Sequence, residues 1–170
     1  MTNTKVPTQS LGVYNYLLAF VRLTYTTLCY WMVALTPEEY HWTKGSTWSR
    51  LRAYRLGAYH FRKLPKYSES TPARVWLGWC YGNLGMSEAA AQHLRLAYSQ
   101  KPHPETALFL AQEELRLGNR DKARDLLAMI DARRHQLSDE LLTEVKALEQ
   151  RLVDSPLATS SYGDGRGNPA

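Results

Sequence analysis

The spacing of apolar side chains divides the chain into segments of different character. Residues 11–35 are almost continuously apolar, and Arg22 is their only charged residue. Residues 36 to 153 show apolar side chains at helical spacing, interrupted by short stretches with Gly or Pro. Residues 1–10 and 154–170 are too polar to bury much surface, so we expect a flexible N-terminus and a disordered tail. The pattern predicts an all-α chain.

The apolar segment 11–35 is long enough for a transmembrane helix, which needs about 20 residues. Tyr and Trp side chains lie near both of its ends, as is typical of membrane interfaces, and basic residues follow the segment. We therefore expect a single-pass helix with the rest of the chain on the cytoplasmic side, and with Arg22 in contact with a partner helix inside the membrane. The alternatives are a helix that lies in the membrane interface and a core helix of a soluble protein.

Residues 36–70 are predicted to form a basic connector. The sequence TPEE at 36–39 is a helix start, with Thr36 as N-cap and Glu39 completing a capping box, and we expect this helix to run through Trp42. A second helix is predicted over 47–64, ending before Pro65. Cations of this region are expected to contact anionic lipid headgroups: Arg52, Arg55, Arg62, Lys63 and Lys66.

The distribution of charge supports this division. The net charge is +5, but residues 1–70 hold nine Lys/Arg against three Asp/Glu, while residues 71–170 hold twelve against thirteen. The basic excess therefore belongs to the N-terminal part. Cys29 and Cys80 form neither a disulfide framework nor a metal-ligand pattern, which favours a reducing compartment.

An internal repeat with a period of about 33 residues follows the connector, and a period of this size is typical of repeat architectures. One such shift aligns Gly78 with Ala111 and Gly85 with Gly118. Four more pairs align at the same shift: Leu77 with Leu110, Ala90 with Ala123, Leu94 with Leu127, and Ala97 with Ile130. A small residue at 78 lets the second helix of a pair approach closely, and Gly85 ends the first helix. We therefore expect helices at about 72–84, 87–100, 105–117 and 120–133.

The first copy resembles the tetratricopeptide repeat at these residues: Leu77, Gly78, Tyr81, Gly85, Ala90, Leu94, Ala97 and Pro102. The resemblance covers about two repeats over residues 71–137 and implies a short helical solenoid. The chain departs from the family pattern with Arg74 in place of tryptophan, Glu114 in place of an aromatic residue, and His135 in place of the second proline. Such arrays need at least three stacked units, so we expect helix 47–64 to pack on the first pair and helix 138–153 to cap the other end, completing an array over 71–153.

The resemblance also implies a binding surface, because the first helix of each pair lines the inner face of such a solenoid. It points to a groove for a protein partner formed by these residues: Val75, Trp79, Asn83, Leu108, Gln112, Leu115 and Arg116. Trp79 and Arg116 are the expected anchors, since Trp and Arg dominate interface energetics. The competing interpretation of Trp79 is packing against the preceding helix.

The sequence offers no catalytic motif. It lacks HExxH, GxSxG and a Walker-type loop, and its five histidines are not at metal-ligand spacing. We therefore expect no enzymatic activity, no cofactor, no nucleic-acid ligand and no small-molecule substrate. The predicted function is a membrane-tethered interaction scaffold, an assembly factor or accessory subunit of a membrane protein complex. The alternative is a soluble adaptor or chaperone whose N-terminal helix packs on the array or mediates oligomerisation.

Overall fold

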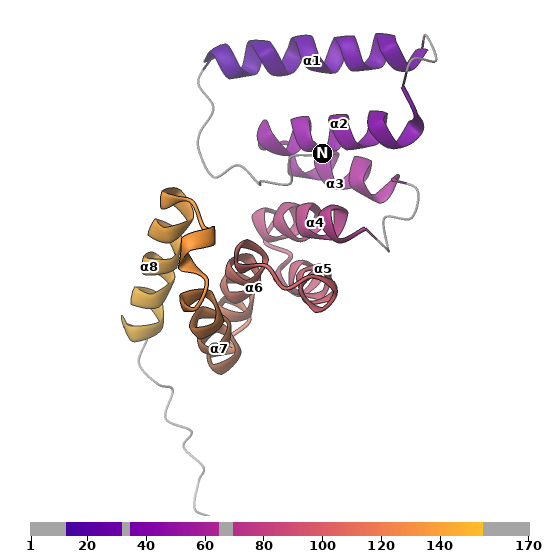
Figure 1. Cartoon of the computed structure of the whole chain (residues 1–170). Helices are drawn as coiled ribbons and strands as arrows, with labels where there is room; N and C mark the ends of the chain where they lie inside the picture. The colour runs from indigo at the N-terminus through magenta and orange to yellow at the C-terminus, as the bar shows by residue number, and fades with distance from the viewer. Residues whose placement is uncertain (1–12, 32–34, 65–69, 155–170) are drawn as a thin grey trace, which may run out of the picture.

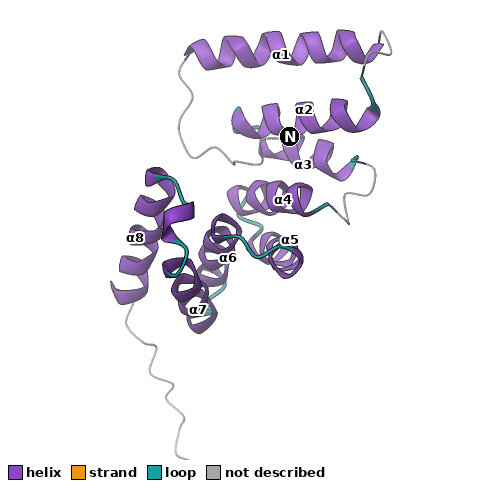
Figure 2. Ribbon diagram, viewed as in Figure 1, coloured by secondary structure: helices purple, strands orange, loops and turns teal. Residues whose placement is uncertain are grey.

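The described part of the chain is entirely helical. The computed structural model describes residues 13–31, 35–64 and 70–154, and the expected flexible N-terminus and nearly all of the expected tail lie outside these ranges. No strand occurs among these residues (Figures 1 and 2). The helices are α1 (Val13–Trp31), α2 (Pro37–Arg50), α3 (Tyr54–Arg62), α4 (Thr71–Asn83), α5 (Ser87–Gln100), α6 (Pro104–Arg116), α7 (Arg120–Asp131) and α8 (Asp139–Asp154), with a short 3₁₀ turn at Arg134–Gln136.

The helices stack in chain order. Each helix from α1 to α8 packs against the next one, and α4 also contacts α6 while α6 contacts α8 (Figure 1). One apolar core runs through this stack, from Ala58 in α3 to Leu152 in α8. The apolar stripe expected on the last helix is confirmed, because four of its side chains are buried: Leu141, Val145, Leu148 and Leu152.

Three helix pairs, α2–α3, α4–α5 and α6–α7, turn at positions that are separated by one repeat period. The turn residues are Arg52, Gly85 and Gly118, which have φ angles of 62°, 75° and 81°. After each turn residue, the next amide donates to the carbonyl four residues before the turn residue, at 2.8–2.9 Å. This is the Schellman arrangement that ends a helix at a left-handed residue. The same turn geometry therefore recurs at this spacing in one helix pair more than the sequence comparison covered.

The predictions of a short helix through Trp42 and of a single helix over 47–64 were both wrong. The capping box at Thr36 and Glu39 is confirmed, but α2 continues through Gly45 to Arg50 and the chain then turns at Arg52. Gly45 lies within α2, where the Phe61 ring packs closely against its backbone. A Cβ at this position would lie only 3.0 Å from the Phe61 ring.

Gly78 has the corresponding role in the next pair. A Cβ at Gly78 would lie 2.5 Å from Leu94 Cγ and 3.2 Å from the Ala90 carbonyl oxygen. The expected role of Gly78 in the close approach of two helices is thus confirmed, and so is the role of Gly85 in ending α4. Both pairs join their helices by the same contact, since Gly45 and Phe61 precede Gly78 and Leu94 by one repeat period each.

Helix α1 packs along α2. The Lys44 ammonium group donates to the Leu23 carbonyl oxygen at 2.6 Å and also to the Thr27 hydroxyl. The Tyr30 and Tyr40 rings stack with centroids 4.4 Å apart. Across the residues that the structure describes, no helix combines the length and apolar character needed to cross a membrane. The expected transmembrane helix over 11–35 therefore finds no support here.

Candidate functional site

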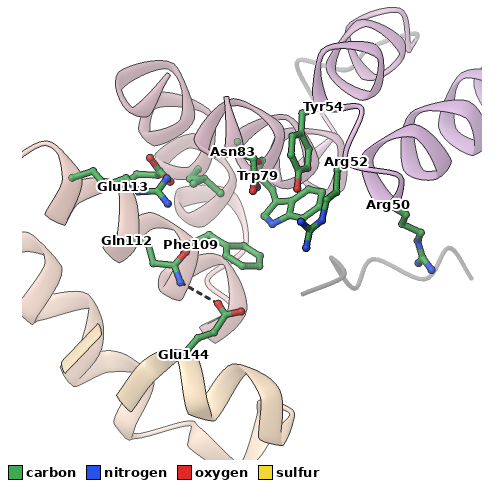
Figure 3. A pocket seen from close by; sticks show the side chains of 12 residues that line it. Arg50, Arg52, Tyr54, Trp79, Asn83, Phe109, Gln112, Glu113 and Glu144 are labelled. Atoms are coloured by element: carbon green, nitrogen blue, oxygen red, sulfur yellow. Dashed lines mark hydrogen bonds and ion pairs between the residues drawn. The ribbon is translucent and has the colours of Figure 1, made fainter. Parts of the chain in front are cut away.

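A pocket lies on the side of the stack where α4, α6 and α8 meet the turn between α2 and α3. Its cavity volume is about 290 Å³. We call it the inner groove, and it is lined by Arg50, Arg52, Tyr54, Gly78, Trp79, Asn83, Leu94, Phe109, Gln112, Glu113, Arg116 and Glu144 (Figure 3). Pockets for small molecules and cofactors begin at about this size.

Most of the expected groove residues come together here. Four of the seven line the inner groove: Trp79, Asn83, Gln112 and Arg116. Leu115 is half-buried and lines a neighbouring hollow between α6 and α8. Val75 and Leu108 do not present a surface, because both are buried in the apolar core. Their assignment to the groove was wrong: they occupy the sides of α4 and α6 that pack inward.

One end of the inner groove is aromatic. The Tyr54 and Trp79 rings meet edge to face with centroids 5.2 Å apart, and Trp79 also meets the buried Trp76 edge to face at 5.8 Å. Trp79 is only half-buried, so part of its ring faces the cavity. Both interpretations of Trp79 therefore describe part of its environment: it packs against the preceding pair, and it also lines the groove.

Arg52 brings a strained backbone to this aromatic end. A non-glycine residue in the left-handed region costs about 1–2 kcal/mol, and Arg52 occupies it at the position where the other two turns have glycine. Figure 3 shows its guanidinium group beside the Trp79 and Tyr54 rings. The expected membrane-surface role of Arg52 does not fit this location, because its side chain lines the groove. Strain of this kind is concentrated at functional sites.

The other end of the groove is polar and internally paired. Arg116 donates from Nη1 to Glu113 Oε1 at 2.6 Å and to the Gly82 carbonyl oxygen at 3.0 Å. Burial raises the pKa of Glu113, while nearby Ser87 and Arg116 oppose this rise. Arg116 is therefore partly engaged in holding a buried carboxylate, and is not the free anchor that was expected.

A second polar contact crosses the same end of the groove. Gln112 Nε2 donates to Glu144 Oε2 at 3.1 Å, which links α6 to α8 (Figure 3). This contact and the Arg116–Glu113 pair use both carboxylates of the groove. The polar end is thus preorganised by contacts within the chain.

The remaining cations of the groove have no carboxylate partner among the described residues. Neither Arg50 nor Arg52 takes part in a salt bridge within that part of the chain. The pKa of Arg50 is lowered by burial and, secondly, by the charge of Arg22, and its Nε atom is buried without a hydrogen bond. The α2 end of the groove therefore carries uncompensated positive charge, which favours an anionic ligand.

The expected lipid-contact residues do not form one surface. Arg55, Arg62 and Lys63 are exposed and border a separate hollow beside Tyr59, whereas Arg52 points into the inner groove. The prediction placed Arg52, Arg55 and Arg62 on one continuous helix. The chain instead turns between α2 and α3, and this turn separates Arg52 from the other two. Lys66 lies outside the described residues, and Arg22 is exposed on α1.

Sequence reasoning placed Arg52 and Leu94 elsewhere, and it missed five further side chains of the groove: Arg50, Tyr54, Phe109, Glu113 and Glu144. The repeat could have supplied a signal for the first two, since Arg52 precedes Gly85 by one period and thereby places a turn between Arg50 and Tyr54.

A histidine pair was also missed. His41 Nδ1 and His60 Nδ1 lie 3.0 Å apart between α2 and α3, within hydrogen-bond distance. Burial, followed by the charges of His41 and Lys44, lowers the pKa of His60 to about 4. Both rings are therefore neutral near pH 7, with one nitrogen donating and the other accepting.

Comparison of the chain with models of protein families, with curated proteins and with solved structures finds no match.

Proposed function

We propose that this protein is an interaction scaffold whose inner groove binds a peptide segment of a protein partner. The observation that carries the proposal is the strained Arg52 beside the half-buried Trp79 in a preformed pocket. Trp and Arg side chains in a partly desolvated site are the residues that contribute most to protein–protein binding energy. The rest of the groove is held in place by its own hydrogen bonds, which lowers the entropy cost of binding.

The chemistry of the groove defines the class of segment that it fits. Tyr54 and Trp79 offer an apolar surface, and Arg50 and Arg52 offer positive charge next to it. A segment with an acidic side chain or a terminal carboxylate beside an aromatic or aliphatic side chain satisfies both. The cavity of about 290 Å³ holds one or two such side chains, not a folded domain.

The resemblance to tetratricopeptide repeats is part of this proposal. The turns at Arg52, Gly85 and Gly118, each one repeat period from the next, are the observation in its favour. Under this interpretation α2–α3 is an additional repeat and α8 is the terminal cap. Repeat arrays of this kind recruit protein partners, which agrees with a role in the assembly of a larger complex.

Membrane attachment through α1 is the second part of the proposal, and it makes the protein an accessory subunit or assembly factor of a membrane complex. Its support is the exposed apolar side of α1 together with the basic character of the N-terminal part. A span over 11–35 is not needed for attachment. A soluble adaptor with α1 packed on the array is the alternative, favoured by the contacts of Lys44 with α1.

An array of random dodecapeptides probed with the purified protein tests the groove. We expect selection of peptides with an acidic residue next to an aromatic or aliphatic one, and at least tenfold weaker binding by the variant Arg52→Gln with Trp79→Leu. The matched control, Arg124→Gln with Met129→Leu, changes exposed residues of α7 and keeps full binding. Equal binding by both variants would overturn the proposal. Arg116 is left unchanged, because its loss would strand the buried Glu113 carboxylate.

A further inference from the structure

Helix α1 has a second apolar side that no described residue covers. Leu23 and Thr26 are buried on the side toward α2, whereas large apolar residues on the other side are exposed. Leu17, Val21, Leu28 and Trp31 recur at spacings of four, seven and three residues, so they form one stripe along the helix. Trp31 is 80% exposed. Apolar patches of this extent on a soluble protein mark an interaction surface.

Charge indicates what covers this stripe. Residues 13–64 hold seven Lys/Arg and only two Asp/Glu, and both acidic residues lie in the first turn of α2. The Glu39 carboxylate is used in the capping box of α2. Arg22 on α1, Arg55 and Arg62 on α3, and Lys63 directly after α3 are exposed. Lys44 is bonded to α1, and Arg50 and Arg52 line the inner groove, so four exposed cations remain for a membrane. An apolar stripe accompanied by exposed cations is complementary to an anionic membrane surface.

A second copy of the chain is a poorer fit for the same stripe. Pairing two α1 helices would bring two basic N-terminal parts together, with a net charge of +5 each from seven cations and two carboxylates over residues 13–64. The repulsion between these two positively charged parts would oppose association. The aromatic side chains Tyr16, Tyr25 and Trp31 are also exposed along α1, as expected at the level of lipid headgroups.

The contacts of α1 with α2 define how the helix meets the membrane. Lys44 holds the Leu23 carbonyl and the Thr27 hydroxyl, and Tyr30 stacks on Tyr40. These contacts leave the side chains of the apolar stripe exposed, so the helix can contact lipid without leaving the array. A helix that crossed the bilayer would have to break them.

We propose that α1 lies in the plane of an anionic phospholipid surface while it stays packed on α2, and thereby holds the repeat array at the membrane. This inference rests on the membrane attachment in the proposed function, and it adds the mode of attachment and the class of lipid. The basic residues supply the preference for anionic lipid, and the apolar stripe supplies the insertion into the headgroup region.

Flotation with phosphatidylcholine vesicles, with and without added phosphatidylglycerol as the anionic lipid, tests the lipid preference. We expect binding that requires the anionic lipid, weakens with added salt, and drops at least tenfold in the variant Val21→Asn with Leu28→Gln. The matched control, Leu96→Gln with Val153→Asn, makes the same chemical changes at exposed residues of α5 and α8 and keeps wild-type binding. Equal loss in both variants, or equal binding to neutral vesicles, would overturn the proposal.

A crosslink between α1 and α2 separates the mode of attachment from attachment itself. Tyr30→Cys and Tyr40→Cys, in a Cys29→Ser background, are joined by a short bifunctional maleimide, and Cys80 is buried away from the reagent. In-plane docking predicts equal vesicle binding before and after crosslinking. Binding only before crosslinking would overturn in-plane docking but leave membrane attachment intact. No binding to any vesicle, with a dimer in light scattering that Val21→Asn with Leu28→Gln dissociates, would overturn attachment and assign the stripe to a second copy.

Discussion

Replacement of Arg52 by glycine is expected to stabilise the fold and weaken the groove at the same time. Arg52 has a φ of 62° at the turn where the other two pairs have glycine. Removing the strain of a left-handed non-glycine residue raises the free energy of unfolding by about 1–2 kcal/mol. The extra freedom of glycine in the unfolded chain lowers it by about 0.4–1 kcal/mol. The net expectation is a gain of roughly 1 kcal/mol, or about 2–4 °C in Tm for a chain of this size.

The assay is thermal unfolding followed by circular dichroism, and the matched control is Gly118→Arg. Gly118 occupies the equivalent turn with a φ of 81°, and a Cβ there meets no atom within 4 Å. The control therefore measures only the conformational cost of a non-glycine residue at this turn. We expect its free energy of unfolding to fall by roughly 1 kcal/mol. An unchanged or lower Tm for Arg52→Gly, together with a lower Tm for Gly118→Arg, would refute the reasoning, because the Arg52 side chain would then stabilise the fold by more than its backbone costs.

The remaining predictions concern packing, protonation and thiol reactivity. Gly78→Ala is expected to lose about 1–3 kcal/mol in chemical denaturation, because its Cβ would lie 2.5 Å from Leu94 Cγ; an unchanged midpoint would contradict this packing. Stability is expected to fall as the pH drops from 6.5 toward 4, since the unfolded His60 takes up a proton near its ordinary pKa of 6.5 while the folded ring stays neutral to about 4. His60→Gln should reduce that slope, and an identical slope would exclude His60 as a cause. Burial raises the pKa of the Cys80 thiol to about 12, so a thiol reagent at pH 8 should label Cys29 alone in the folded chain and both cysteines in urea; labelling of Cys80 in the folded chain would contradict this.

The repeat period was readable from the sequence because its signal is simple. Small residues at 78, 90, 111 and 123 and glycines at 85 and 118 are needed wherever helices pack closely and turn sharply. The first pair was not included in this comparison: Gly45 aligns with Gly78 at the same shift, but Arg52 stands in place of the turn glycine. Gly45, which falls between the two helices predicted through Trp42 and over 47–64, instead lies inside α2 against Phe61. A left-handed arginine leaves no local signal, since residue propensity disfavours it.

The groove was predicted only in part, for a physical reason. The resemblance to the tetratricopeptide repeat implied that Trp79, Asn83, Gln112 and Arg116 line a groove, and these four do line the pocket. The resemblance alone does not tell how far the groove side of each helix turns inward, so Val75 and Leu108 were included although they are buried. The ion pair that holds Arg116 on Glu113 depends on close packing against Gly82, where a Cβ would lie 2.4 Å from the Glu113 carboxylate.

The central claim is that a protein partner occupies the inner groove, and site-specific photocrosslinking in living cells tests it most directly. A photoreactive phenylalanine analogue replaces Trp79 in the groove or, as the control, Leu96 on the exposed side of α5. We expect a discrete crosslinked partner from position 79 that disappears with Arg52→Gln, and no such product from position 96. The same product from both positions, or a product from position 79 that Arg52→Gln leaves unchanged, would contradict it.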